Sequence, residues 1–132
     1  MTLKVTDEKK FTAGELAELM ASVGWGEDAT PDVFLQAMMN ATHVISARAD
    51  GKLVGIVRSM DDGCWSANID CLVVHKDYAH KGIGTMIMRV LLDKLASVKY
   101  ISVSPNEAKN ASFYVRFGFK LVPDGRLLQI CK

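Results

Sequence analysis

Residues 72–85 read LVVHKDYAHKGIGT, and the fold is best worked out from this stretch. Its first three residues close an apolar, strand-like run from Cys64 to His75, and Gly82 opens a helical pattern that continues to Ser97. A strand, a turn and a helix in this order direct backbone N–H groups to one point at the helix N-terminus. Because Gly82 and Gly84 lack a Cβ, the backbone there can approach a phosphate closely. The stretch predicts an anion site, although a tight turn without a ligand would use the same residues.

Two common classes of phosphate loop do not fit these residues. A dinucleotide fingerprint requires a third glycine where this chain has Ile87, and it follows a strand that opens a βαβ unit. The GxxxxGK[ST] loop of nucleoside triphosphatases is absent. The loop therefore indicates a phosphate-bearing ligand of another class.

Two helices are predicted before this stretch. Thr12-Ala13-Gly14-Glu15 is a capping box, and apolar residues follow it at helical spacing. Thr30-Pro31 opens a second helix, since proline suits the first helical position. Its expected buried side consists of Phe34, Leu35, Met38 and Met39.

An antiparallel meander is predicted over residues 43–75. The runs 43–49 and 52–60 are joined by Asp50-Gly51, a pair that tolerates the positive φ of a tight hairpin turn. In the third run, strict alternation puts Trp65, Ala67, Ile69, Cys71 and Val73 on one apolar face. Asp70 then points away from that face, unless a strand bulge changes the parity.

The remaining elements complete a mixed α/β chain. A strand over 100–103 precedes a helix from Ser104 to about Phe117, and strands over 119–122 and 127–131 flank a turn at 123–125. The predicted order is βααβββαβαββ, an α+β arrangement with a mixed, mostly antiparallel sheet flanked by helices. We expect a single domain over residues 1–132.

Composition excludes several functional classes. The chain has 132 residues, 49% hydrophobic and 23% charged, with a net charge of +1, which disfavours disorder and general nucleic-acid binding. No apolar run is long enough to span a membrane, and the polar first 11 residues favour a cytoplasmic protein. Three cysteines without a CxxC pair indicate small buried thiols and no metal site.

The chain resembles the GNAT superfamily of acetyl-coenzyme A-dependent N-acetyltransferases. Two blocks carry the resemblance: residues 72–85, and the run Phe113-Tyr114-Val115-Arg116-Phe117-Gly118-Phe119. They occur in the family's order, separated by a helix and a strand. The resemblance implies a sheet whose fourth and fifth strands splay apart, with acetyl-CoA as co-substrate in the gap.

The same resemblance implies the residues that hold acetyl-CoA. Backbone groups of Leu72, Val73 and Val74 would pair with the pantetheine arm and thioester. The pyrophosphate would rest on amides of the loop formed by Ala79, His80, Lys81, Gly82, Ile83, Gly84 and Thr85. The usual Arg or Gln before the loop is Ala79 here, which removes one phosphate contact; Lys81 or His80 is expected to compensate. The family's asparagine is displaced, and Asn106 is carried over for it as a pantetheine or phosphate contact.

Acetyl transfer needs a base for the amine and an acid for the leaving thiolate. Tyr114 is the expected general acid, with a packing role as the alternative. Asp70, or a chain of waters, is the expected base, and an ordinary strand carboxylate is the alternative. A backbone N–H of Leu72 or Val73 would stabilise the developing oxyanion. Cys71 is not expected to act as a nucleophile, because it falls on the apolar face.

Charge favours a cationic acceptor amine on a small molecule, peptide or protein. Residues 75–132 carry 10 basic and 4 acidic groups, which suits polyanionic CoA. The predicted helices before residue 43 carry only acidic groups, at Glu15, Glu18, Glu27, Asp28 and Asp32. No nucleic-acid or membrane partner is expected, and exposed late strands suggest a homodimer. A non-catalytic acyl-CoA sensor on the same scaffold is the alternative function.

Overall fold

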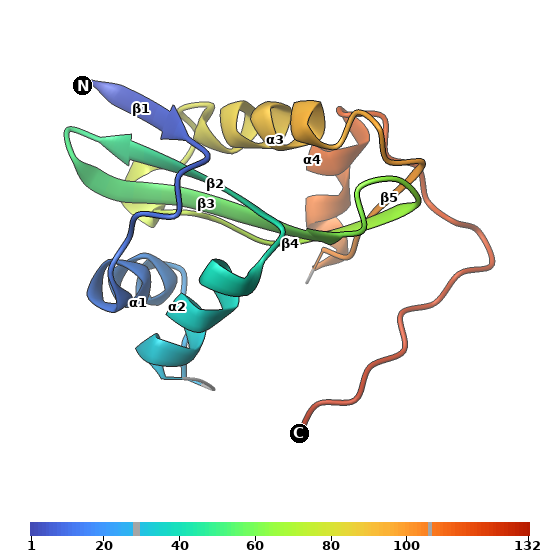
Figure 1. The fold of residues 1–132 in the computed structure, drawn as a ribbon, viewed down its shortest axis with the longest axis horizontal. Coiled ribbons are helices and arrows are strands. Elements are labelled where there is room, and N and C mark those ends of the chain that lie inside the picture. Colours follow the sequence, from blue (N-terminus) through green and yellow to red (C-terminus); the bar gives the residue numbers. More distant parts are fainter. Residues whose placement is uncertain (28–29, 106) are drawn as a thin grey trace.

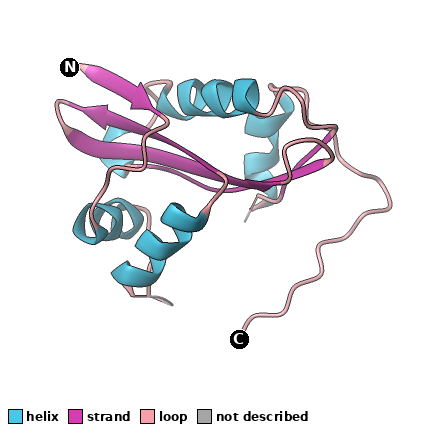
Figure 2. Ribbon diagram, in the orientation of Figure 1, coloured by secondary structure: helices cyan, strands magenta, loops and turns pink. Residues whose placement is uncertain are grey.

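The computed structural model describes residues 1–27, 30–105 and 107–132. A five-stranded sheet in the order β1-β2-β3-β4-β5 forms the middle layer. Helices α1 and α2 lie on one face and α3 on the other (Figures 1 and 2). The element bounds are β1 Leu3–Thr6, α1 Ala13–Ser22, α2 Pro31–Asn40, β2 His43–Ala49, β3 Lys52–Asp61, β4 Ser66–Val74, the 3-10 turn η1 Lys76–Tyr78, α3 Ile83–Lys94, β5 Tyr100–Val103, the 3-10 turn η2 Ala108–Asn110 and α4 Ala111–Val115.

The sheet confirms the predicted fold class. β1 to β4 pair antiparallel, and β5 pairs with β4 in parallel through the crossover that contains α3. Asp50 and Gly51 turn between β2 and β3 with φ of 48° and 86°, as the hairpin prediction requires. The meander therefore runs through consecutive neighbours, and β4 lies between β3 and β5.

The caps of the first two helices are also confirmed. The Thr12 hydroxyl accepts from the Glu15 N–H at 3.1 Å, and a Glu15 carboxylate oxygen accepts from the Thr12 N–H at 2.9 Å. The Thr30 hydroxyl caps α2, with Pro31 at the first helical position. Met38 is buried as expected, whereas Met39 is 47% exposed, because the apolar stripe of α2 is narrower than its sequence suggests.

Two apolar cores hold the helices on the sheet. One packs α3 on the sheet through Ile83, Ile87, Met88 and Leu91, and the other packs α1 and α2 through Leu16, Leu19, Met20 and Met38. At Gly55 a Cβ would lie only 3.0 Å from Ile83 Cγ2. The glycine on β3 thus lets the first turn of α3 approach the sheet closely, which sets the position of the loop before α3.

A β-bulge in β4 overturns the predicted alternation. Ile56 pairs with Val73 and Arg58 with Asp70, so one β3 residue faces both Cys71 and Leu72. Cys71 takes φ 55° at this point. The parity therefore reverses: Cys71 and Val73 pack with the α1 and α2 core, and Leu72 and Val74 pack on the α3 side with Ala67 and Ile69. Trp65 is 59% exposed and belongs to neither core.

The fourth and fifth strands splay apart as expected. β5 has four residues, and its pairing with β4 ends at Ile69 and Val103. β4 continues for five more residues, from Asp70 to Val74, without β5 beside it. The bulge lies at the start of this unpaired stretch, so it bends β4 where the strands separate.

The C-terminal third differs from the prediction in two ways. The helix predicted from Ser104 begins later, with η2 at Ala108 and α4 at Ala111, and Ser104 and Pro105 have no regular secondary structure. The two strands predicted over 119–122 and 127–131 are not formed. A turn does form between Val122 and Gly125, but the chain beyond it extends away from the body (Figure 1). Strand pairing needs a partner edge, which apolar composition alone does not supply.

Replacement of Glu15 by Gln should lower the free energy of unfolding by about 1 kcal/mol at pH 7, because it removes the charge that pairs with Arg48 while the amide oxygen can still cap the helix. The side chain also accepts from Arg48, and that pair holds the pKa of Glu15 below its ordinary value. Its stabilising contribution is present above pH 4.5, the ordinary value, and is lost as pH falls through the lowered folded pKa. Denaturant unfolding from pH 3 to 7 should therefore show the gap between wild type and Glu15→Gln closing in acid.

The matched control is Glu8→Gln, since Glu8 is exposed and pairs with the exposed Lys10. This control should stay within about 0.5 kcal/mol of wild type. An equal loss in both variants would show that the ion pair between Glu15 and Arg48 does not stabilise the fold.

Candidate functional site

The N-terminus of α3 forms an uncapped cradle of backbone amides. Gly82 occupies the cap position in the left-handed conformation, φ 79°, and His80 takes φ 62° just before it. Unlike α1 and α2, α3 receives no side-chain cap from any part of the chain that the structure describes. The first helical N–H groups are therefore free for an anion, and the helix dipole favours negative charge there.

A pocket of about 460 Å³ opens at this cradle. It brings together most of the loop residues singled out from the sequence; its lining comprises Val74, Tyr78, Ala79, His80, Gly82, Ile83, Gly84, Thr85, Phe113 and Arg116. Lys81 does not line it, and its Nζ lies 5.8 Å from the centroid of the Tyr78 ring instead. Asn106 lies outside the described residues.

Arg116 is the cation of this pocket that sequence reasoning did not select. It follows α4, its guanidinium lies 5.0 Å from the Phe113 ring centroid, and its Nη2 donates to the Thr85 hydroxyl at 3.4 Å. The guanidinium thus reaches the first turn of α3 from the opposite side. The available signal was its position next to Tyr114 in the block from Phe113 to Phe119, but only the folded chain brings it to the loop.

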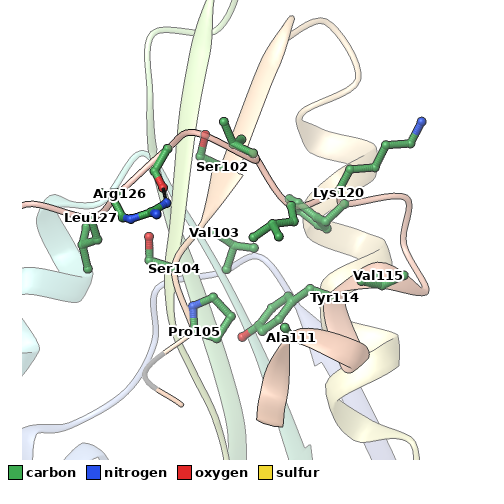
Figure 3. Close-up of a pocket in the computed structure, with 14 residues that line it drawn as sticks. Ser102, Val103, Ser104, Pro105, Ala111, Tyr114, Val115, Lys120, Arg126 and Leu127 are labelled. Carbon is green, nitrogen blue, oxygen red and sulfur yellow. Dashed lines mark hydrogen bonds between the residues drawn. The ribbon is translucent and has the colours of Figure 1, made fainter. Parts of the chain in front are cut away.

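A second pocket, of about 540 Å³, contains Tyr114 (Figure 3). Ser102, Val103 and Ser104 form one side, residues from Phe119 to Val122 another, and Tyr114 projects into the space between them. Burial raises the pKa of Tyr114 above its ordinary value. The phenol is therefore protonated at neutral pH and available as a hydrogen-bond donor.

Asp70 faces the α2 side of the sheet and is held by Arg58. Arg58 Nε donates to Asp70 Oδ1 at 2.6 Å and Nη2 donates to Oδ2 at 3.1 Å, while Nη1 donates to the Ala37 carbonyl oxygen. The Asp70 side chain is 37% exposed, so part of it still reaches solvent. This bidentate pair explains the raised pKa of Arg58, and it leaves the outer lone pairs of the carboxylate open.

Cys71 and His75, the other candidates from the sequence, have surroundings that suit a structural role. Burial, followed by the nearby Asp70 charge, raises the pKa of the Cys71 thiol to about 11, which suppresses the thiolate a nucleophile requires. His75 is buried, and its Nδ1 accepts from the Asp77 N–H.

The described residues contain no group of three His, Cys, Asp or Glu placed to hold a metal ion. Among the helices that the structure describes, none has the length and apolar composition of a membrane span.

Comparison with known proteins identifies the family. A model of the acetyltransferase (GNAT) domain matches residues 40–121. The chain belongs to the GNAT family of acetyltransferases. It is 30% identical over 126 residues to an uncharacterised N-acetyltransferase, ycf52, of Pyropia yezoensis, covering 92% of this chain and 72% of that one.

Solved structures share the fold over nearly the whole chain. A protein of unknown function from meticillin-resistant Staphylococcus aureus superposes with a TM-score of 0.88 at 23% identity, covering 99% of this chain and 100% of the other. A GNAT-family acetyltransferase from Streptococcus pneumoniae superposes with a TM-score of 0.83 at 21% identity, covering 99% and 98%. The GNAT fold implies acetyl-CoA as co-substrate and an amine as acceptor, and the chain is accordingly a GNAT N-acetyltransferase in general terms.

Cys71 should be alkylated by iodoacetamide at pH 8 at least about tenfold more slowly than Cys64, because its thiolate fraction is far smaller. Cys64 is exposed and serves as the internal control. Mass spectrometry of tryptic peptides at timed intervals measures both rates in one sample. Equal rates would show that the Cys71 thiol is accessible to the reagent and that its pKa is not raised.

Proposed function

We propose that this GNAT protein transfers the acetyl group of acetyl-CoA to a primary amine by direct attack, with Tyr114 as general acid. The observation that carries the proposal is the pocket where the uncapped N-terminus of α3 meets Val74, at the end of the unpaired stretch of β4. The half-buried Tyr114 phenol on α4 supports it. These three features would hold the diphosphate, the pantetheine arm and the reacting sulfur in turn. Binding both substrates in one cleft supplies much of the rate enhancement.

The diphosphate end of the site would combine backbone amides with one guanidinium. The N–H groups of Ile83, Gly84 and Thr85 meet the anion from the helix, and Arg116 adds a charge-assisted contact from α4. This guanidinium supplies the phosphate contact that the family's usual Arg or Gln would make at the position of Ala79. The role expected of Lys81 passes to Arg116, whose side chain lines the pocket.

Backbone groups of β4 would hold the pantetheine arm and thioester. The His75 N–H donates to the Val54 carbonyl oxygen on β3 at 2.8 Å. Because successive N–H groups of a strand alternate, those of Leu72 and Val74 turn to the open edge beside β5, and that of Val73 turns to β3. Leu72 and Val74 therefore suit the thioester and pantetheine, and the Leu72 N–H suits the developing oxyanion.

Tyr114 would donate its proton as the carbon–sulfur bond breaks. The amine nitrogen attacks the thioester carbonyl carbon, the tetrahedral intermediate collapses, and the leaving thiolate takes the phenolic proton. Burial keeps that proton on the phenol at neutral pH. The direct route needs no acetylated side chain, in agreement with the high pKa of Cys71.

Asp70, directly or through water, would receive the proton released by the amine. Arg58 occupies one face of the carboxylate, and the outer lone pairs remain open to an ammonium group or a water. A cationic amine is the acceptor class this charge favours. The acidic character of α1 is smaller than its sequence suggests, because Glu15 pairs with Arg48 and Glu18 with Lys52.

Tyr114→Phe should lower kcat by about 100-fold, the lower end of general-acid contributions, and leave the KM for acetyl-CoA within about twofold. Release of CoA measured with a panel of primary amines gives both constants. Tyr100→Phe is the control, because Tyr100 is 53% exposed on β5 and should keep wild-type kcat.

Acetyl-CoA binding without turnover on any amine would contradict the proposed reaction and favour the sensor. Full activity of Tyr114→Phe would refute the acid role alone.

Arg116→Ala should raise the Kd for CoA about tenfold, since a hydrogen bond between charged groups contributes roughly 1.5–3 kcal/mol. Isothermal titration at two salt concentrations should also show a weaker salt dependence than wild type, because one charge contact is gone. Arg89→Ala removes the same charge from the exposed side of α3 and is the matched control. Equal affinities for the two variants would exclude Arg116 from the phosphate site.

A further inference from the structure

Arg58 joins the C-terminal end of α2 to the Asp70 carboxylate. Its Nε and Nη2 donate to the two carboxylate oxygens at 2.6 and 3.1 Å, and its Nη1 donates to the Ala37 carbonyl oxygen at 3.2 Å. One guanidinium therefore binds a side chain of β4 and the backbone of α2 at the same time. The Arg58 side chain is only 20% exposed, so its surroundings hold it in this position.

The end of α2 takes its positive charge from outside the helix. Carbonyl groups of the last helical turn lack helical partners, and α2 has no basic residue of its own there. Lys9 Nζ donates to the carbonyl oxygens of Met39 and Ala41, and Arg58 donates to that of Ala37. Both cations also suit the negative end of the helix dipole. The guanidinium differs from the Lys9 ammonium because it binds the carboxylate of β4 as well.

The sheet face beside Arg58 is covered by α2 on one side and open on the other (Figure 1). Met38 of α2 is fully buried in the core beneath the helix. In the opposite direction, Met60 and Asn68 pair in register, and strand alternation puts them on the same face as Arg58 and Asp70. Both are exposed, Met60 at 44%. An amine can therefore reach Asp70 across the open face.

We propose that Arg58 is a positioning residue, which fixes the Asp70 carboxylate to the end of α2 and so sets its orientation toward the acceptor amine. The inference rests on the proposed function, in which Asp70 receives the proton of that amine. A planar guanidinium bonded to both oxygens fixes the direction and the rotation of the carboxylate together. The lone pairs that Arg58 does not occupy are then held in one place for the amine or a water.

A second arginine provides an internal comparison. Arg48 also binds a carboxylate through both Nη atoms, that of Glu15 at the N-terminus of α1. Its remaining contacts are the carbonyl oxygens of Gly51 and Lys10, so it joins the helix cap to the hairpin between β2 and β3. Arg48 thus has the same chemistry as Arg58 without a contact to β4, and it separates a general loss of an ion pair from a change at Asp70.

Arg58→Lys tests the role, because lysine keeps the charge but not the planar, forked donor. Its kcat/KM for a primary amine should fall at least about tenfold, since a displacement of about 1 Å near the reacting atoms can cost about 100-fold. The loss should fall on kcat more than on KM, because Asp70 takes the proton in the transition state. The Kd for CoA, measured by calorimetry, should stay within about twofold, since Arg58 lies on the other side of the sheet from α3.

Lys9→Met and Arg48→Lys are the matched controls. The first removes the other cap of α2, and the second breaks the other forked pair. Both should keep kcat/KM within about twofold of wild type, since neither side chain contacts Asp70. Wild-type kcat/KM in Arg58→Lys, or an equal loss in Lys9→Met, would overturn the positioning role.

Hydrogen exchange tests the link between Asp70 and α2 without the reaction. Asp70→Asn weakens the hold of β4 on Arg58, so the amides of residues 38–40 should exchange about fivefold faster as the last turn of α2 loosens. Asn68→Ala changes an exposed neighbour on the same face and should leave this exchange at the wild-type rate. Unchanged exchange in Asp70→Asn would overturn the link, and this measurement decides it even if Arg58→Lys fails to fold.

Failure of the proposed function would be seen separately. Wild-type protein that released no CoA with any amine would refute acetyl transfer, while the exchange rates in α2 would still decide whether Arg58 joins the helix to Asp70. Turnover by wild type, together with full activity of Arg58→Lys, would refute the positioning role and leave the acetyltransferase assignment standing.

Discussion

The site depends on the point where β4 and β5 stop pairing. Parallel pairing ends at Ile69 and Val103 because β5 is only four residues long, and β4 continues past it. A strand edge buried against α3 with no neighbour must satisfy its N–H groups in another way. A ligand that carries amide groups, as pantetheine does, can replace the missing strand. The chemistry we propose follows from this incomplete pairing.

Two local features convert the open edge into a site. The bulge at Cys71 reverses the faces of β4, which brings Leu72 and Val74 to the α3 side and moves Cys71 beside Asp70 and Arg58. Gly55 lets α3 pack closely on the sheet, so the uncapped helix N-terminus lies at the end of the same edge. The anion cradle and the open strand edge are thereby fixed relative to each other by packing.

Much of the fold and part of the candidate site were predictable from the sequence, and the predictions that failed did so for physical reasons. The capping box of α1, the Thr30-Pro31 start of α2 and the Asp50-Gly51 turn depend on residues close in sequence, and each was confirmed by the structure. The alternation of β4 failed at Cys71, because a non-glycine residue with φ 55° is stabilised by its neighbours in the sheet and carries no local signature. Arg116 was missed because its partner Thr85 is 31 residues away.

By itself, the amino-acid sequence determined the order of elements as far as α4, the glycine-rich turn before α3 and the resemblance to the GNAT family, since these rest on short-range periodicity and on two compact blocks. Tertiary structure alone decided which β4 side chains face which helix, that Arg58 holds Asp70, and that the described apolar residues after α4 form no strands. Each of these depends on contacts between distant segments, and a strand exists only where another edge accepts its hydrogen bonds.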